Sequence, residues 1–209
     1  MKKTTCDLWL GDQIPLRVAI IGEGQTEYYC VPKLAGRCGH VVIGSAWIRM
    51  VNPDFDWERL FELRVVPLVM AMLLKNPDKI VVIIDKEDRV ECPAELAQRG
   101  LAIIQSQCGH CVGNCAITVV ISNKSFECLL FADYEAVDKL PILRAPVSQT
   151  FPPTTNGQSV IPWIKSGLKP GSAYHKIRDG MFLAQRIDYG KPEIQGRCRS
   201  LRKLVRELT

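Results

Sequence analysis

The chain has 209 residues, enough for one sizeable domain or for one domain with a small appendage. Hydrophobic residues make up 47% and charged residues 23%, which excludes a disordered chain and is ordinary for a folded, water-soluble protein. The net charge of +5 is mild, and the longest nearly uncharged stretch, Val65 to Leu74, is too short to span a bilayer.

The N-terminal part of the chain alternates apolar runs with amphipathic segments. Aliphatic runs predict buried strands at Arg17–Gly22, His40–Gly44, Lys79–Ile84 and Ala116–Ile121. Helices are expected at Gly24–Arg37, with a bend at Pro32, and at Phe55–Leu74, Pro93–Gln105 and Ser125–Asp133. This alternation predicts an α/β fold, with a Rossmann-like parallel sheet of about four strands and helices on both faces.

The pattern changes in the last third of the chain. Residues 140–157 contain Pro141, Pro146, Pro152 and Pro153, and they predict a long connection that leaves the sheet. Helical segments follow near Ser159–Gly167, Tyr174–Asp188 and Arg199–Leu208. We therefore expect a first domain at residues 1–140, and a proline-rich connection with a basic helical extension at residues 141–209.

Acidic side chains follow three of the predicted strands. Glu23 stands between two glycines after the first strand, Asp85 and Glu87 follow the third, and Glu127 lies just past the fourth. Because the carboxyl ends of parallel strands share one edge of the sheet, where ligands bind, these carboxylates are expected to converge. Unpartnered negative charge is costly and recruits a hard cation such as Mg²⁺ or Mn²⁺. The alternative is that each carboxylate is a solvated loop residue or a helix cap.

Glu27 has two interpretations. It lies four residues after Glu23, in the expected first turn of a helix, where the helix dipole favours a carboxylate. We favour this structural role over metal ligation, although Glu27 remains an additional ligand candidate.

Nine cysteines without a secretion signal predict reduced thiols rather than a disulfide framework. Met1 to Lys3 is not followed by an apolar core, so the expected location is cytoplasmic. Cys108 and Cys111 have the spacing of a zinc-binding pair. Further ligands would come from Cys115 or His110, and from Cys92 or Cys128. A single pair is a weak zinc signal, so free, partly buried cysteines in a loop before a strand are the preferred interpretation.

The C-terminal end is basic. Between Arg186 and Thr209 seven basic residues face three acidic ones. Such a segment suits a polyanion such as nucleic acid, and a solvated helix face is an equally good interpretation. The residues expected to bind nucleic acid are Arg197, Arg199, Arg202 and Lys203.

Three segments carry a resemblance to a known fold. "IIGEGQTE", "VVIIDKED" and "VVISNKSFECLLFAD" resemble TOPRIM proteins, most closely the small TOPRIM proteins related to the OLD (overcoming lysogenization defect) nucleases. Those proteins have a glutamate after strand one, an Asp-x-Asp pair after strand three and a phenylalanine-glutamate step after strand four. The match covers about Arg17 to Asp133. The later segments "AYHKIRDG" and "GRCRSLRKLVREL" are similar to the tail of the same family.

The resemblance implies a role for each matching residue. Glu23 would be a metal ligand or general base, Asp85 and Glu87 the paired acids, and Glu127 a ligand toward a second metal. Lys176 would be the basic catalytic residue that approaches the phosphate. Glu87 departs from the family pattern, which has aspartate there; glutamate can still ligate from one methylene further out, and Asp88 is a substitute candidate. The implied cofactors are one or two Mg²⁺ or Mn²⁺ ions.

The resemblance also implies an activity and partners. It implies a metal-dependent nuclease that hydrolyses DNA or RNA and works with an ATPase in phage defence. The chain has no Gly-x-x-x-x-Gly-Lys motif, so the ATPase would be a separate partner protein. One alternative is a non-catalytic TOPRIM-like subunit that binds nucleic acid or acts as an adaptor. Another is a zinc-stabilised module at residues 108–115, and a homo-oligomer fits each of these hypotheses.

Overall fold

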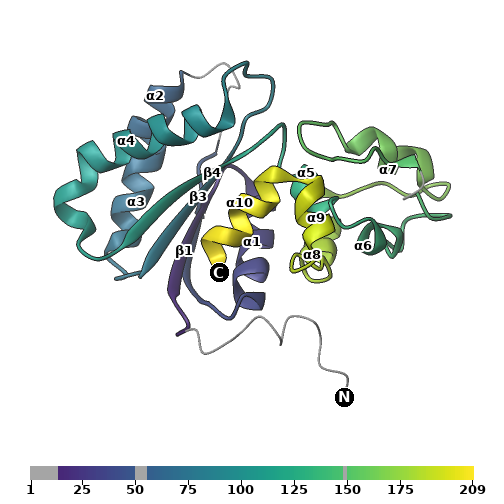
Figure 1. Ribbon diagram of the computed structural model, residues 1–209, viewed down its shortest axis with the longest axis horizontal. Helices are drawn as coiled ribbons and strands as arrows, with labels where there is room; N and C mark the ends of the chain where they lie inside the picture. The colour runs from purple at the N-terminus through teal and green to yellow at the C-terminus, as the bar shows by residue number, and fades with distance from the viewer. Residues whose placement is uncertain (1–13, 50–55, 148–149) are drawn as a thin grey trace.

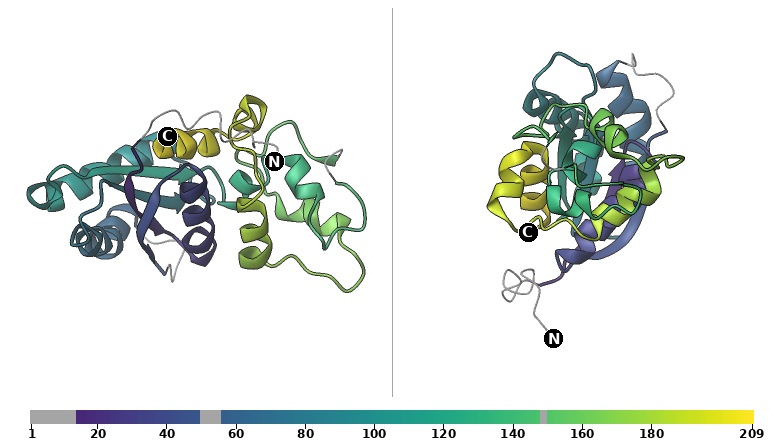
Figure 2. Two further views of the ribbon diagram at one scale, coloured as in Figure 1. Left: turned by 90° about the horizontal axis from the view of Figure 1, so that it is seen from below. Right: turned by 90° about the vertical axis from the view of Figure 1, so that its right-hand side faces the viewer.

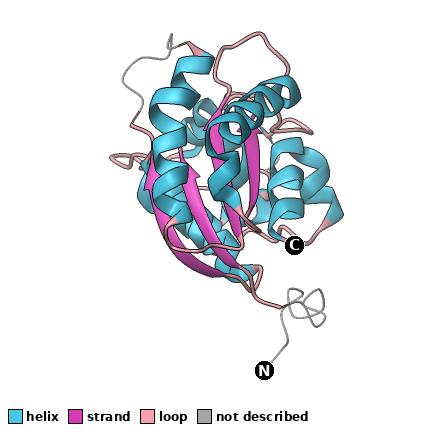
Figure 3. Ribbon diagram, turned by 90° about the vertical axis from the view of Figure 1, so that its left-hand side faces the viewer, coloured by secondary structure: helices cyan, strands magenta, loops and turns pink. Residues whose placement is uncertain are grey.

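The computed structural model describes residues 14–49, 56–147 and 150–209, and its centre is a four-stranded sheet. The strands are β1 (Arg17–Gly22), β2 (Val41–Trp47), β3 (Lys79–Asp85) and β4 (Ala116–Ser122). They lie in the order β2-β1-β3-β4 and all pair in parallel (Figures 1 and 3). The predicted Rossmann-like α/β fold is therefore confirmed.

Helices cover both faces of this sheet, as predicted (Figure 3). Helix α1 (Gln25–Arg37) and helix α10 (Arg199–Leu208) share one hydrophobic core with alternate residues of the strands, such as Ile20. The opposite core contains the other strand residues, such as Ile21, and side chains of the helices between β2 and β4. Alternation between the two cores explains why β1, β3 and β4 are mainly apolar on both faces.

The helical stretch after β2 is not uniform. Helix α2 (Trp57–Leu60) continues through the π-helical segment η2 (Phe61–Val65) into helix α3 (Val66–Leu73). Pro67 in the first turn of α3 has no N–H to donate to the preceding turn, which accounts for the irregularity. The predicted start at Phe55 lies outside the described residues.

Helix α4 (Pro93–Val112) is longer than predicted. The prediction ended it at Gln105. Burial of Cys108 carries the core-facing side of the helix one turn further, and Gly113, with φ 54°, ends it. The expectation that these cysteines lie in a loop was therefore wrong for Cys108 and Cys111.

The rest of the chain forms short helices beyond the end of the sheet (Figures 1 and 2). They are α5 (Glu127–Leu130), α6 (Tyr134–Asp138), α7 (Ile161–Gly167), α8 (Lys176–Ala184) and α9 (Pro192–Arg197). The predicted helix at Ser125–Asp133 is broken, because the Asp133 side chain accepts from Ala136 N and starts α6. The helix predicted at Tyr174–Asp188 is shorter, and α9 was not predicted.

The C-terminal helices join the α1 face of the sheet through a common core. Ile164 and Leu183 belong to the same buried cluster as Val18 of β1. Helix α10 then returns along the sheet beside β4 (Figure 1). Within the described ranges, no helix is long and apolar enough to cross a membrane.

Candidate functional site

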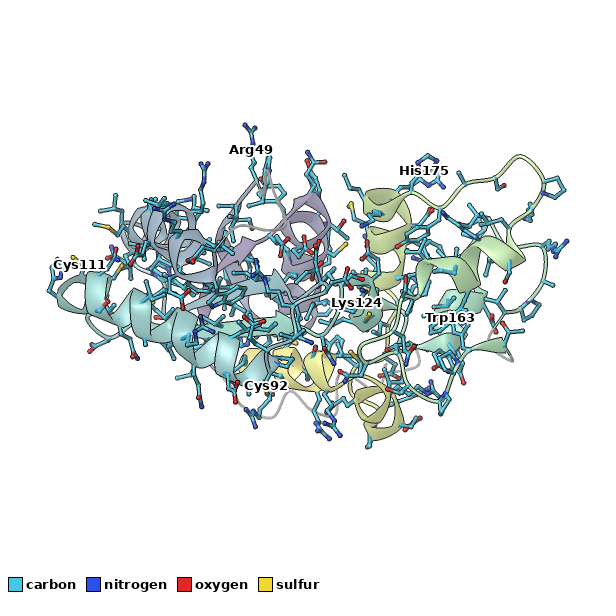
Figure 4. All side chains as sticks on the ribbon, turned by 90° about the horizontal axis from the view of Figure 1, so that it is seen from above. Arg49, Cys92, Cys111, Lys124, Trp163 and His175 are labelled. Carbon is cyan, nitrogen blue, oxygen red and sulfur yellow. The ribbon has the colours of Figure 1, made fainter. Side chains whose placement is uncertain are left out.

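A cavity of about 650 Å³ lies at the carboxyl ends of the strands, and we call it the carboxylate cavity. Its lining includes Glu23, Asp85, Glu87 and Glu127, which follow or end β1, β3 and β4, together with Lys176. The sequence-based expectation that these side chains converge at one edge of the sheet agrees with this geometry. Figure 4 looks onto the molecule from above, with Arg49, another lining residue, labelled.

Glu23 is positioned by the tight junction between β1 and α1. A side chain at Gly22 would bring its Cβ within 2.5 Å of Glu27 Cβ, so a glycine is required where the helix crosses the strand end. Glu23 is 9% exposed, and its Oε2 accepts a hydrogen bond of 2.7 Å from Asp85 N. This bond joins the ends of β1 and β3.

Burial raises the pKa of Glu23 to about 7. The hydrogen bond from the Asp85 amide opposes this shift, while the negative charges of Glu27 and Glu87 add to it. A carboxylate that titrates near neutral pH can hold or release a proton under ordinary conditions, which is the property of a general base.

Asp85 is a second carboxylate of the cavity with a strongly shifted pKa. Burial, followed by the negative charges of Glu27, Glu23 and Glu127, raises its pKa well above the ordinary value. Its Oδ1 is buried, and no hydrogen-bond partner for it occurs among the described residues. A buried carboxylate oxygen without a partner, beside other carboxylates, is a local electrostatic cost within the fold.

Lys176 brings a cation to the cavity from the C-terminal part of the chain. As the first residue of α8, it pairs with Glu127 at 3.1 Å between Nζ and Oε1. The Glu127 side chain is 3% exposed, whereas that of Lys176 is 64% exposed. Burial lowers the pKa of Lys176, but attraction to Glu127 and Asp85 outweighs it and the net shift is upward. Lys176 therefore stays charged and reaches solvent.

Glu27 combines the two roles considered for it. It lies in the first turn of α1, and its Oε2 accepts a hydrogen bond of 2.9 Å from Gly24 N. It also lines the carboxylate cavity, where burial and the charge of Glu127 raise its pKa. The helix cap therefore adds negative charge to the cavity.

The two remaining acidic candidates lie further out. Glu87 is exposed at the rim of the cavity, on a backbone with φ 52°, and its N–H donates to Lys124 O. Asp88 is exposed, pairs with Lys124 and does not line the cavity. The structure therefore gives no support to Asp88 as a substitute ligand.

Sequence reasoning missed the residues that β2 contributes. The strand extends to Trp47 instead of ending at Gly44, which brings Trp47 and Arg49 to the cavity. The Arg49 guanidinium carbon lies 5.6 Å from the centroid of the Trp47 ring, a cation–π contact. An arginine shortly after a strand was the available signal, and the early strand end concealed it.

The donor set of the cavity suits a hard divalent cation. Carboxylate oxygens, one of them buried without a partner, are the ligands that Mg²⁺ and Mn²⁺ prefer. In the side-chain positions of the described residues, no group of three or more His, Cys, Asp or Glu is arranged to hold a metal ion. The fit is therefore one of residue type and charge.

The cysteine candidates are spread over a helix and its surroundings. Cys108 is buried in the core below α4, Cys111 is exposed, and Cys115 is buried before β4. Cys92 and Cys111 stand at opposite ends of α4, whose 20 residues separate them by roughly 1.5 Å each (Figure 4). Cys92 therefore cannot join Cys111 at one ion. Cys128 is buried beside Gln158 O, and His110 is exposed.

The basic candidates do not line the carboxylate cavity. Arg197 donates a hydrogen bond of 3.1 Å to Ala132 O, and its guanidinium carbon lies 4.2 Å from the centroid of the Tyr134 ring. Arg199, Arg202 and Lys203 lie on α10, where Arg199 and Lys203 line a second cavity and Arg202 is exposed. Arg197 is thus engaged within the protein, and the others face a different surface.

Comparisons with known proteins do not add a family to these observations. No protein-family model matches the chain, and neither the curated proteins nor the solved structures searched contain a similar protein.

Proposed function

We propose that this protein is a metal-dependent nuclease of the TOPRIM type that hydrolyses phosphodiester bonds in DNA or RNA. The observation that carries the proposal is the carboxylate cavity, where buried acids from distant segments meet at the carboxyl ends of parallel strands. The raised pKa values of Glu23 and Asp85, and the unpartnered Asp85 Oδ1, are what an acidic site has before a cation compensates it.

Asp85 and Glu127 would hold Mg²⁺ or Mn²⁺, with Glu87 contributing from the rim. When bound, such an ion activates water and stabilises negative charge on the attacked phosphate. The surrounding residues transfer the proton and bind the substrate. Glu23, with a pKa of about 7, accepts a proton from the attacking water.

Cations at the mouth of the cavity position the substrate. Lys176 is held by Glu127 yet extends into solvent, so its Nζ can contact a phosphate oxygen. Arg49 is exposed on the same rim and offers a second phosphate contact. Both residues approach from outside the acidic centre, which separates binding of the phosphodiester backbone from activation of water.

The proposal includes a separate ATPase partner and a role in phage defence. These two elements rest on the resemblance of the strand-end motifs to the small OLD-like TOPRIM proteins.

The decisive experiment compares Asp85→Asn with Asp88→Asn. Both changes replace an aspartate by its neutral isostere, at the last residue of β3 or in the loop that follows it, but only Asp85 lines the cavity. Each protein is incubated with DNA and RNA in magnesium or manganese, alone and with an ATPase encoded beside it. Asp85→Asn should lower the cleavage rate about a thousandfold or more, because metal-bound groups supply several kcal/mol in such reactions. Equal rates for wild type and Asp85→Asn would exclude the proposal.

A non-catalytic adaptor is the second candidate. It is favoured by the exposed, left-handed Glu87 at the position of the second family aspartate, since an acid directed into solvent weakens a two-metal site. In the same experiment, nucleic-acid binding without cleavage by the wild type under any metal would identify an adaptor.

A further inference from the structure

The outer edge of β4 has no described strand beside it. Within the described part of the sheet, β4 pairs only with β3. Ala116 N donates to Asp78 O, and Ser122 O accepts from Lys86 N, so this alternate set of residues faces β3. The N–H and C=O groups of Ile117 and Val119 therefore point outward, as on the edge of any sheet.

One end of this edge is already closed by a side chain. The Ser200 hydroxyl of α10 accepts a hydrogen bond of 3.0 Å from Asn123 N and donates one of 3.1 Å to Ile121 O. It thus replaces the backbone of a neighbouring strand at the carboxyl end of β4. The described residues provide no such group for the edge at residues 117–119.

A cavity of about 510 Å³ lies beside this edge, between α4 and α10, and we call it the β4 groove. One wall is mainly apolar and comes from α4, with Ala97 and Leu101. The other wall is basic and comes from α10, with Arg199, Lys203 and Arg206. Figure 4 shows α10 beside the Cys92 end of α4.

We propose that the β4 groove binds an extended, acidic segment of a partner protein, which adds to the sheet as a strand beside β4. Outward backbone groups recognise an extended chain through main-chain hydrogen bonds. Side chains of such a strand point alternately to its two faces, so apolar residues would meet α4 and acidic residues would meet α10. The two walls of the groove match this alternation.

The charge of the groove argues against the two other occupants. A second copy paired edge to edge would bring Arg199 and Arg206 of both chains together, and like charges across an interface are costly. Nucleic acid would use the basic wall but neither the outward amides of β4 nor the apolar side of α4. An acidic strand uses all three features.

This inference is independent of the proposed nuclease activity, because the β4 groove and the carboxylate cavity share no lining residue. The first test uses two synthetic peptides of about eight residues, one alternating valine with glutamate and one alternating valine with lysine. Fluorescence anisotropy should show at least about tenfold tighter binding of the acidic peptide. Hydrogen exchange of the Ile117 and Val119 amides should slow when it binds.

Two variants test the charge and the edge separately. Arg199→Glu combined with Arg206→Glu should weaken binding of the acidic peptide at least about tenfold. The matched control, Arg59→Glu combined with Arg64→Glu, makes the same charge change on exposed positions of α2 and η2 and should leave binding unchanged. Ile117→Pro removes one outward N–H without removing a bond to β3, and it should also weaken binding.

Circular dichroism and thermal melting identify any variant that fails to fold. If Ile117→Pro does not fold, the binding of the Arg199→Glu/Arg206→Glu protein and the hydrogen exchange of the Ile117 and Val119 amides decide whether the proposal holds. The proposal is overturned if the acidic peptide does not bind, or if both peptides bind equally. A second outcome also overturns it: short duplex DNA binds to the wild type and not to the Arg199→Glu/Arg206→Glu protein, while neither peptide binds. Self-association that Ile117→Pro abolishes would instead assign the edge to a second copy.

Discussion

The carboxylate cavity and the β4 groove differ in the sign and in the burial of their charged side chains. In the cavity, Glu23 and Glu127 are almost fully buried beside other acids. In the groove, Arg199 and Arg206 are exposed at the border of an apolar wall. The cavity therefore carries an electrostatic cost within the folded protein, visible in the raised pKa values of Glu23 and Asp85.

This difference separates two kinds of functional surface. Buried like charges are costly to the folded state, and this cost is the basis on which we propose chemistry for the cavity. Exposed cations beside unpaired backbone cost the fold little, and they are the basis on which we propose a partner for the groove. The net charge of +5 reveals neither surface, because acidic residues gather in the cavity and basic residues gather at the groove.

After Asp85→Asn, the next largest expected effect tests whether the two regions are functionally separate. Glu23→Gln removes the proton acceptor and one charge from the cavity, and it should lower cleavage about a hundredfold or more. Arg199→Glu combined with Arg206→Glu should leave cleavage of a short oligonucleotide within about twofold, because neither residue lines the cavity. Equal losses in both proteins would mean that the groove takes part in the reaction.

The pH dependence of stability should follow from the buried acid. Folding raises the pKa of Glu23 from 4.5 to about 7, so the folded state binds its proton more tightly than the unfolded state. The free energy of unfolding should therefore fall as pH rises between these two values, by up to about 3 kcal/mol from this residue. Thermal melting from pH 4.5 to 8 measures the fall.

Two additions make this measurement specific. Glu23→Gln cannot titrate at that position, so its melting temperature should depend less on pH than that of the wild type. Saturating magnesium should stabilise the wild type more at pH 8 than at pH 6, because the metal competes with protons. A Glu23→Gln protein with an unchanged pH dependence would contradict the assignment.

A smaller effect comes from comparing two lysine–glutamate pairs. Lys176 pairs with Glu127 in the cavity, and Lys203 pairs with Glu207 on α10. Lys176→Ala should lower cleavage about tenfold to a hundredfold, since it removes a phosphate contact and leaves a buried carboxylate unpaired. Lys203→Ala should change cleavage less than about twofold, because its half-buried pair lies on α10 and Lys203 does not line the cavity. Oligonucleotide cleavage under single-turnover conditions tests both.

The smallest expected effect concerns a position away from both regions. Cys111 is exposed near the end of α4, so Cys111→Ser should change the free energy of unfolding by less than about 0.5 kcal/mol. Chemical denaturation measures this change, and metal analysis accompanies it. One tightly bound zinc ion per chain that is lost in Cys111→Ser would contradict this expectation and support the zinc site at residues 108–115.

Several features were predictable because they depend on neighbours in the sequence. Three of the four strands, β1, β3 and β4, are mainly apolar runs, and parallel strands bring their carboxyl ends to one edge. That reasoning was enough to group Glu23, Asp85 and Glu127. It failed for β2, whose half-buried residues weaken the apolar pattern, so Trp47 and Arg49 were missed.

Other features depend on contacts between distant segments. Helix α4 continues past Gln105 because Cys108 packs into the core, a contact that helical propensity does not report. Lys176 reaches Glu127 only because α8 packs against α1 and α5.

The β4 groove is the feature that the sequence predicts least. The residues of "AITVVIS" predict a strand, but not that it lies at an edge or that Ser200 closes one end of it. Apolar periodicity follows from the local chain and decides which residues are buried. Strand order and the approach of α10 follow from the packing of the whole chain, and they decide which backbone groups of β4 remain open to a partner.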